Sequence, residues 1–139
     1  MSTRSNIAAL QSDGSVKVIY CHFDGYVDDV GELLANHYTD PAKVDELIEL
    51  GDISLLGKEI GEQQDFSDRE THNKDWTIAY GRDRGDSNVE AITLLNVDEF
   101  ISITHEDNMI AYFYLFANGE WTVYSDDLVV SPVKLSEVA

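Results

Sequence analysis

Alternating apolar and polar residues predict two pairs of strands, one near each end of the chain. Residues 6–11 and 15–23 flank Asp13-Gly14, a dipeptide that tolerates the positive φ angles of a tight turn. The second of these segments is apolar at both odd and even positions, which is typical of a strand inside a sheet. Toward the other end, Asn118-Gly119 divides the aromatic-rich residues 109–125. The pattern therefore predicts an N-terminal and a C-terminal β-hairpin.

Between the hairpins the apolar period changes to three and four residues, which is typical of amphipathic helices. A first helix is expected from Val27 to Tyr38. A second helix follows Asp40-Pro41, an N-cap with proline at the first helical position, and ends at Gly51. Asn96, with Glu99 three residues later, predicts a third, short helix.

The remaining segments complete the expected fold. Residues 76–80 and 91–95 have the composition of strands separated by a loop, and residues 52–75 are predicted to form a long irregular connection. We expect a single domain over residues 1–139, of the α+β class. Its mainly antiparallel sheet is built from the N- and C-terminal β-hairpins and is packed with two or three short helices.

Composition adds a strong negative charge to this picture. The chain of 139 residues has 27 Asp and Glu against 9 Lys and Arg, a formal net charge of −18, together with 43% hydrophobic residues. The hydrophobic content is sufficient for a core. The charge disfavours direct binding to nucleic acid or to an anionic membrane surface. It favours a partner protein with a basic surface, such as the groove of a nucleic-acid-binding protein.

Other global features indicate a cytoplasmic protein. Cys21 is the single cysteine and cannot form an internal disulfide, and the chain does not open with a basic segment followed by an apolar stretch. No stretch approaches the ~20 consecutive apolar residues that a membrane span requires. We therefore expect a cytoplasmic location and no association with a membrane.

Five stretches of the sequence are distinctive sequence motifs. They are MSTRSNIA at residues 1–8, IYCHFDGY at 19–26, Leu33-Leu34 with His37-Tyr38, GDISL at 51–55 and GRDRG at 81–85. In these stretches the chain resembles a family of small phage and prophage proteins. The resemblance implies a phage accessory protein acting in the cytoplasm of the infected host cell, and it carries over no catalytic chemistry. Because such proteins commonly bind and disable host machinery, it favours an inhibitor or modulator of a host defence or nucleic-acid-handling protein.

The two predicted acidic helices are the first candidate binding surface. Residues at a spacing of three and four lie ~5 to 6 Å apart along a helix face. Rows of carboxylates on such a frame could imitate the phosphates of DNA and bind a basic groove. The alternative is that these side chains are only solvated, or that the protein comes from a high-salt background. The candidate residues are Asp28, Asp29, Glu32, Asp45, Glu46, Glu49 and Asp52.

The aromatic C-terminal hairpin is the alternative interface. Exposed aromatic side chains anchor many protein–protein contacts, so the hairpin could form a homo-oligomer or a complex with another protein. Alternating aromatic residues in a strand are more often divided between one buried face and one amphipathic face. The residues concerned are Tyr112, Tyr114, Phe116, Trp121 and Tyr124.

Catalytic and metal-binding chemistry has weaker support. Cys21 and His22 point to opposite faces of a strand and, with Asp24, match no standard zinc spacing, so we expect no metal, no cofactor and a buried, inert thiol. His37, His72 and His105 are scattered along the chain and suggest no catalytic role. We expect a protein that is not an enzyme.

Gly81 to Gly85 form a glycine-flanked loop that contains Arg82 and Arg84. Two arginines could hold a phosphate or carboxylate through bidentate contacts. The favoured interpretation is that they pair with carboxylates of this chain. A small-molecule-binding protein or an enzyme that uses this loop with His22 is the third hypothesis for the function.

Overall fold

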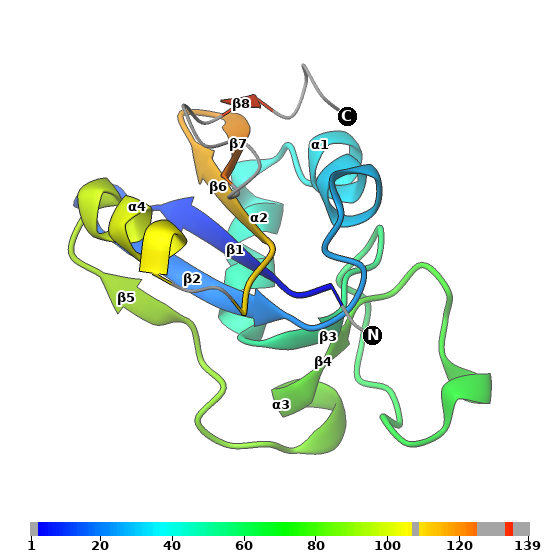
Figure 1. Ribbon diagram of the computed structural model, residues 1–139. Helices are drawn as coiled ribbons and strands as arrows, with labels where there is room; N and C mark the ends of the chain where they lie inside the picture. The colour runs from blue at the N-terminus through cyan, green and yellow to red at the C-terminus, as the bar shows by residue number, and fades with distance from the viewer. Residues whose placement is uncertain (1–2, 107–108, 125–132, 135–139) are drawn as a thin grey trace.

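The strands form one mixed sheet that runs through the molecule. The computed structural model describes residues 3–106, 109–124 and 133–134 (Figure 1). Its strands are β1 (Ser5–Leu10), β2 (Val16–Cys21), β3 (Ile53–Leu55), β4 (Ile78–Ala79), β5 (Ile92–Leu94), β6 (Tyr112–Ala117), β7 (Glu120–Tyr124) and β8 (Val133–Lys134). The strand order is β4-β3-β2-β1-β6-β7-β8, and β5 pairs with β2 beside β3.

Helical segments connect the strands. They are the π-helical turn η1 (Val27–Gly31), α1 (Glu32–His37), α2 (Pro41–Leu50), the 3₁₀ turn η2 (Arg69–Thr71), α3 (Tyr80–Arg84) and α4 (Val97–Glu106). Together they place the chain in the predicted α+β class. Among the described residues, no helix is both long and apolar enough to cross a bilayer.

Both predicted hairpins are present, and the turn of the second has the expected chemistry. β1 pairs antiparallel with β2, and β6 pairs antiparallel with β7. Asn118 and Gly119 both have positive φ, 54° and 79°, as a two-residue hairpin turn of the primed type requires.

The prediction of a mainly antiparallel sheet needs one correction, because the hairpins meet through a parallel pair. β1 runs parallel to β6, with Ile7 opposite Tyr114, and β2 runs parallel to β3. Parallel neighbours require a long crossover connection. For β1 and β6, the crossover connection includes the helices between residues 27 and 106. The sheet is therefore mixed.

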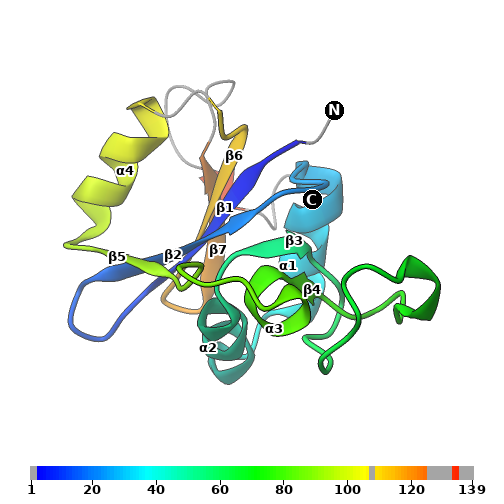
Figure 2. The ribbon, with the colours of Figure 1, turned by 90° about the horizontal axis from the view of Figure 1, so that it is seen from below.

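The two faces of the sheet have separate cores. On one face, α1 and α2 cover Ile7 and Ile19, and on the other face α4 covers Ala8 and Val18. Figure 2 shows α4 on the opposite side of the strands from α1 and α2. Because β2 contributes buried side chains to both cores, the prediction that it is an interior strand is confirmed.

Helix α2 begins and ends where its capping residues predict. The Asp40 carboxylate accepts a hydrogen bond from the Ala42 amide at 3.0 Å, and Pro41 is the first helical residue. Gly51 ends the helix at φ 79°, and a Cβ there would lie 2.3 Å from the Val89 carbonyl oxygen. Only glycine satisfies both conditions without displacement of the backbone.

The other helices agree with the prediction in position but differ in detail. The first predicted helix is composite, because η1 precedes α1. Before α4, the Asn96 side chain accepts a hydrogen bond from the Glu99 amide at 2.9 Å, as expected. Residues 81–84, predicted to be a loop, form α3 together with Tyr80, which was predicted to end a strand. The irregular segment 52–75 contains β3 and η2, which are each only three residues long and therefore show no periodicity.

Trp121 provides a test of the core that lies under α1 and α2. Its side chain is 5% exposed, and its indole N–H donates a hydrogen bond to the Tyr38 carbonyl at 2.8 Å. We expect Trp121→Ala to lower the free energy of unfolding by about 3 to 5 kcal/mol, with a smaller loss for Trp121→Phe, which keeps the ring. Urea denaturation measures both losses. Full stability of the Trp121→Ala variant would contradict this placement of Trp121.

Candidate functional site

Six of the seven predicted acidic residues are exposed, on helical segments that pack on one side of the sheet. We call them the acidic face: Asp28, Asp29, Glu32, Asp45, Glu46 and Glu49, all exposed. They lie on η1, α1 and α2, whose apolar sides pack into the same core. The amphipathic pattern that buries Val30, Leu34 and Leu47 therefore turns these carboxylates toward solvent.

The carboxylates at the start of this surface are close enough to affect one another. Partial burial raises the pKa of Asp29 above its ordinary value, and the negative charges of Asp28, Asp24 and Glu32 raise it further. Asp28, Asp29 and Glu32 also line a shallow depression of about 390 Å³, which Lys58 borders. The first part of the acidic face is thus a compact negative cluster.

Little positive charge offsets the acidic face. Between residues 24 and 49 the chain has a single Lys or Arg, which is Lys43. The Lys43 ammonium lies 3.1 Å from the Glu59 carboxylate, donates to the Lys58 carbonyl at 2.8 Å and lies over the Tyr38 ring. These contacts direct it to the connection that follows β3. Near α2, Lys17 lines the same shallow depression as Glu49.

Asp52 does not belong to this surface. Its carboxylate is partly buried and accepts a hydrogen bond from the Tyr20 amide at 2.9 Å, which ties the end of α2 to β2. Burial raises its pKa above the ordinary value. The prediction grouped Asp52 with the acidic residues of the helices, whereas the structure links it to a strand, which its position just after a helix does not reveal.

The aromatic side chains of the alternative interface are mostly buried. Tyr114, Phe116 and Trp121 are at most 7% exposed. Tyr112 is half-buried and its ring stacks on Tyr114, and Tyr124 is half-buried against Phe100. Both faces of the hairpin are covered because each face of the sheet has its own core, which a single strand pattern does not show.

Cys21 and His22 lie on opposite sides of the chain, as predicted. Cys21 is fully buried, and burial raises the pKa of its thiol to about 12. His22 is half-buried, and its Nδ1 lies 2.6 Å from the Tyr20 hydroxyl. Across residues 3–106, 109–124 and 133–134, no group of three or more His, Cys, Asp or Glu is arranged to hold a metal ion.

The other histidines are also separated from one another. His37 is half-buried and lines the same depression as the acidic residues of η1 and α1, while the His72 Nε2 donates to the Asp65 carbonyl at 2.7 Å. The side chain of His105 lies outside the described residues.

Arg82 and Arg84 pair with carboxylates of this chain, which confirms the favoured interpretation. The Arg84 guanidinium lies 2.6 Å from the Asp86 carboxylate at the surface. Arg82 pairs with Asp83, whose side chain is fully buried, at 3.0 Å. The Arg82 guanidinium also donates to three backbone carbonyls: those of Ile60, Gly61 and Thr77.

Asp83 accepts hydrogen bonds from backbone amides in addition to its pairing with Arg82. Its two carboxylate oxygens accept from the amides of Gln64, at 2.8 Å, and Ala79, at 2.7 Å. Its backbone carbonyl accepts from the Phe66 amide. The Arg82–Asp83 pair thus joins α3 to β4 and to the connection 57–72.

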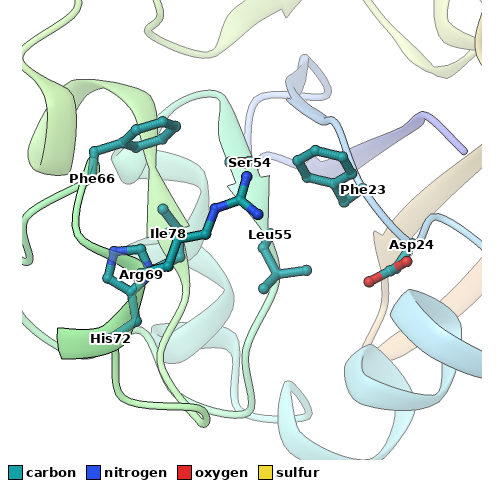
Figure 3. Close-up of a pocket in the computed structure, with 8 residues that line it drawn as sticks. All are labelled: Phe23, Asp24, Ser54, Leu55, Phe66, Arg69, His72 and Ile78. Atoms are coloured by element: carbon teal, nitrogen blue, oxygen red, sulfur yellow. The ribbon is translucent and has the colours of Figure 1, made fainter. Parts of the chain in front are cut away.

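A cavity of about 300 Å³, which the sequence patterns did not predict, lies beside this connection (Figure 3). Three segments line it: the turn after β2, the adjacent strands β3 and β4, and the connection around η2. Its lining residues are the apolar Phe23, Leu55, Phe66 and Ile78 and the polar Asp24, Ser54, Arg69 and His72. No local spacing relates these segments, because only the tertiary fold brings them together.

Comparisons with models of protein families, with curated proteins and with solved structures found no match for this chain.

The Arg82–Asp83 pair predicts unequal effects of two similar substitutions. Asp83→Ala leaves the Arg82 charge and two backbone amides without their buried partner, so we expect a loss of about 3 kcal/mol in unfolding free energy. Asp86→Ala removes the carboxylate of the exposed pair, and its loss should be much smaller. Urea denaturation measures both changes. We also expect the Gln64 and Ala79 amides to exchange hydrogen faster in Asp83→Ala but not in Asp86→Ala, which would place the loss of stability at the Asp83 carboxylate. Equal losses of unfolding free energy in the two variants would contradict this prediction.

Burial of Cys21 predicts an unreactive thiol in the folded protein. With its pKa raised to about 12, the thiol remains protonated at pH 8. We expect a thiol-specific reagent to label native protein at least about a thousandfold more slowly than urea-unfolded protein, because the thiolate is the reacting species. Cys21→Ser controls for nonspecific labelling. Equal labelling rates for native and unfolded protein would contradict the burial of Cys21.

Proposed function

We propose that this protein binds a basic surface of a partner protein through its acidic face and excludes nucleic acid from that surface. The observation that carries the proposal is the exposure of six carboxylates on η1, α1 and α2, with Lys43 held by Glu59. A surface of one sign attracts an oppositely charged partner and repels competing polyanions.

The packing of the helices supports this function. Each carboxylate belongs to a segment whose apolar side is fixed in the core, so the charges sit on an ordered frame. A preorganised surface loses less entropy on binding than a disordered acidic segment does. This favours recognition of one basic groove over unspecific attraction.

The resemblance to small phage and prophage proteins supports the biological part of the proposal. An acidic protein of this kind would act in the cytoplasm of an infected host cell, on a host defence or nucleic-acid-handling protein. The proposed action is competitive binding and includes no catalysis.

Two triple variants test this proposal. Asp28→Asn/Asp29→Asn/Glu32→Gln neutralises the first part of the acidic face, and Asp45→Asn/Glu46→Gln/Glu49→Gln neutralises the second. We expect each to weaken capture of the partner from host lysate by roughly tenfold or more, because each removes three attractive charges. Capture by the wild type should also fall steeply between about 50 and 500 mM salt. Quantitative pull-down measures both effects.

A matched control variant distinguishes the effect of removing charge from the acidic face from the effect of lowering the net charge of the protein. Glu62→Gln/Glu70→Gln/Asp98→Asn also removes three exposed carboxylates, but from outside the acidic face. It should retain capture. Equal weakening by all three variants would indicate a general charge effect, and binding that is insensitive to salt and to both acidic-face variants would contradict the proposal.

A further inference from the structure

We infer that the cavity between β3 and the η2 connection binds a small aromatic anion, a flat ring that carries a carboxylate or phosphate group. This function goes beyond the proposed binding of a partner, and it uses other residues. Four observations support it: the apolar lining of the cavity, the position of the Arg69 guanidinium, the unpartnered hydroxyl of Ser54 and the contacts that hold the cavity walls.

The apolar lining suits a ring of modest size. Phe23 and Phe66 stand on opposite sides of the opening, with Leu55 and Ile78 between them (Figure 3). The volume of about 300 Å³ is at the lower end for small-molecule sites and is sufficient for one or two rings. Phe23 is 37% exposed, so a ligand that covers it removes apolar surface from water.

Arg69 supplies the positive charge. Its guanidinium extends from η2 toward the centre of the cavity, between the two phenylalanine rings (Figure 3). Arg82 and Arg84 are both paired with carboxylates, whereas the side chain of Arg69 has no hydrogen bond or ion pair within the described part of the chain. In a protein with 27 acidic residues, this leaves a planar donor group free to bind an anion.

Ser54 adds a second donor at the base of the cavity. The residue is 7% exposed, and its hydroxyl has no hydrogen-bond partner among the residues that the structure describes. A hydroxyl without a protein partner is free to donate a hydrogen bond to an oxygen of a bound ligand. Asp24, the acidic residue of the lining, lies at the opposite end from Arg69 (Figure 3), so the anionic group is expected at the Arg69 end.

The cavity is preformed rather than assembled by the ligand. The Phe66 ring packs against Tyr80 and under the Arg84 guanidinium, 4.7 Å from the ring centroid, and the Phe66 amide donates to the Asp83 carbonyl. On the other side, Phe23 makes an edge-on contact with His22, with centroids 4.5 Å apart. Walls that are fixed before binding reduce the entropy cost of binding.

Ligand titrations followed by amide NMR shifts test this inference on the wild-type protein. The probes are benzoate and phenyl phosphate, with benzyl alcohol as the neutral analogue. We expect one or both anions to shift the amides of Ser54, Leu55 and Ile78, with an affinity at least about tenfold higher than that of benzyl alcohol. Tighter binding of benzoate would identify carboxylates as the ligand class, and tighter binding of phenyl phosphate would identify phosphate esters.

Arg69→Gln should weaken anion binding roughly tenfold or more, because it removes the charge. Lys74→Gln is the matched control, since it removes an exposed positive charge from the same connection outside the cavity, and it should bind like the wild type. Arg69 is exposed, and an unchanged spectrum of the free variant would show that the fold is intact. The inference is overturned if neither anion shifts these amides at millimolar concentration, or if Arg69→Gln binds both as tightly as the wild type.

Discussion

The Arg82–Asp83 pair is the constraint on which the irregular half of the molecule depends. Strands β3 and β4 have only three and two residues, so their ladder alone cannot hold the connection between them. The buried carboxylate binds two backbone amides, and the guanidinium binds three backbone carbonyls, all in segments that lack long secondary structure. Loss of one partner would leave a charge and several backbone groups unsatisfied. The cavity beside Phe66 and Arg69 exists because this connection has a fixed path.

The packing of helices on both faces of the sheet determines which carboxylates are exposed to solvent. Because α1 and α2 bury their apolar sides in one core, their exposed carboxylates lie on the same side of the sheet, and α4 covers the other face. Six of the 27 acidic residues are thus exposed on η1, α1 and α2. Five of the nine Lys and Arg residues lie between residues 58 and 84, where two of them are paired with carboxylates and Arg69 enters the cavity. The two proposed binding sites therefore use different residues of the molecule.

Local signals predicted the elements whose physical causes are local. Asp40-Pro41, Gly51 and Asn118-Gly119 act through neighbouring backbone groups, so the sequence alone was sufficient for α2 and the second hairpin. The parallel pairing of β1 with β6 joins residues more than a hundred positions apart, and no periodicity encodes it. For the same reason the burial of Trp121, the link from Asp52 to β2 and the cavity became visible only in the fold.

The acidic face is expected to compete with nucleic acid for its partner, and displacement of a DNA or RNA duplex measures this directly. The purified partner is loaded with a fluorescent duplex, this protein is added, and fluorescence anisotropy reports the bound fraction. The account predicts full displacement at low salt, and little displacement by a variant in which the six residues of the acidic face are neutralised. A ternary complex in which the duplex stays bound, or equal displacement by that variant, would contradict it.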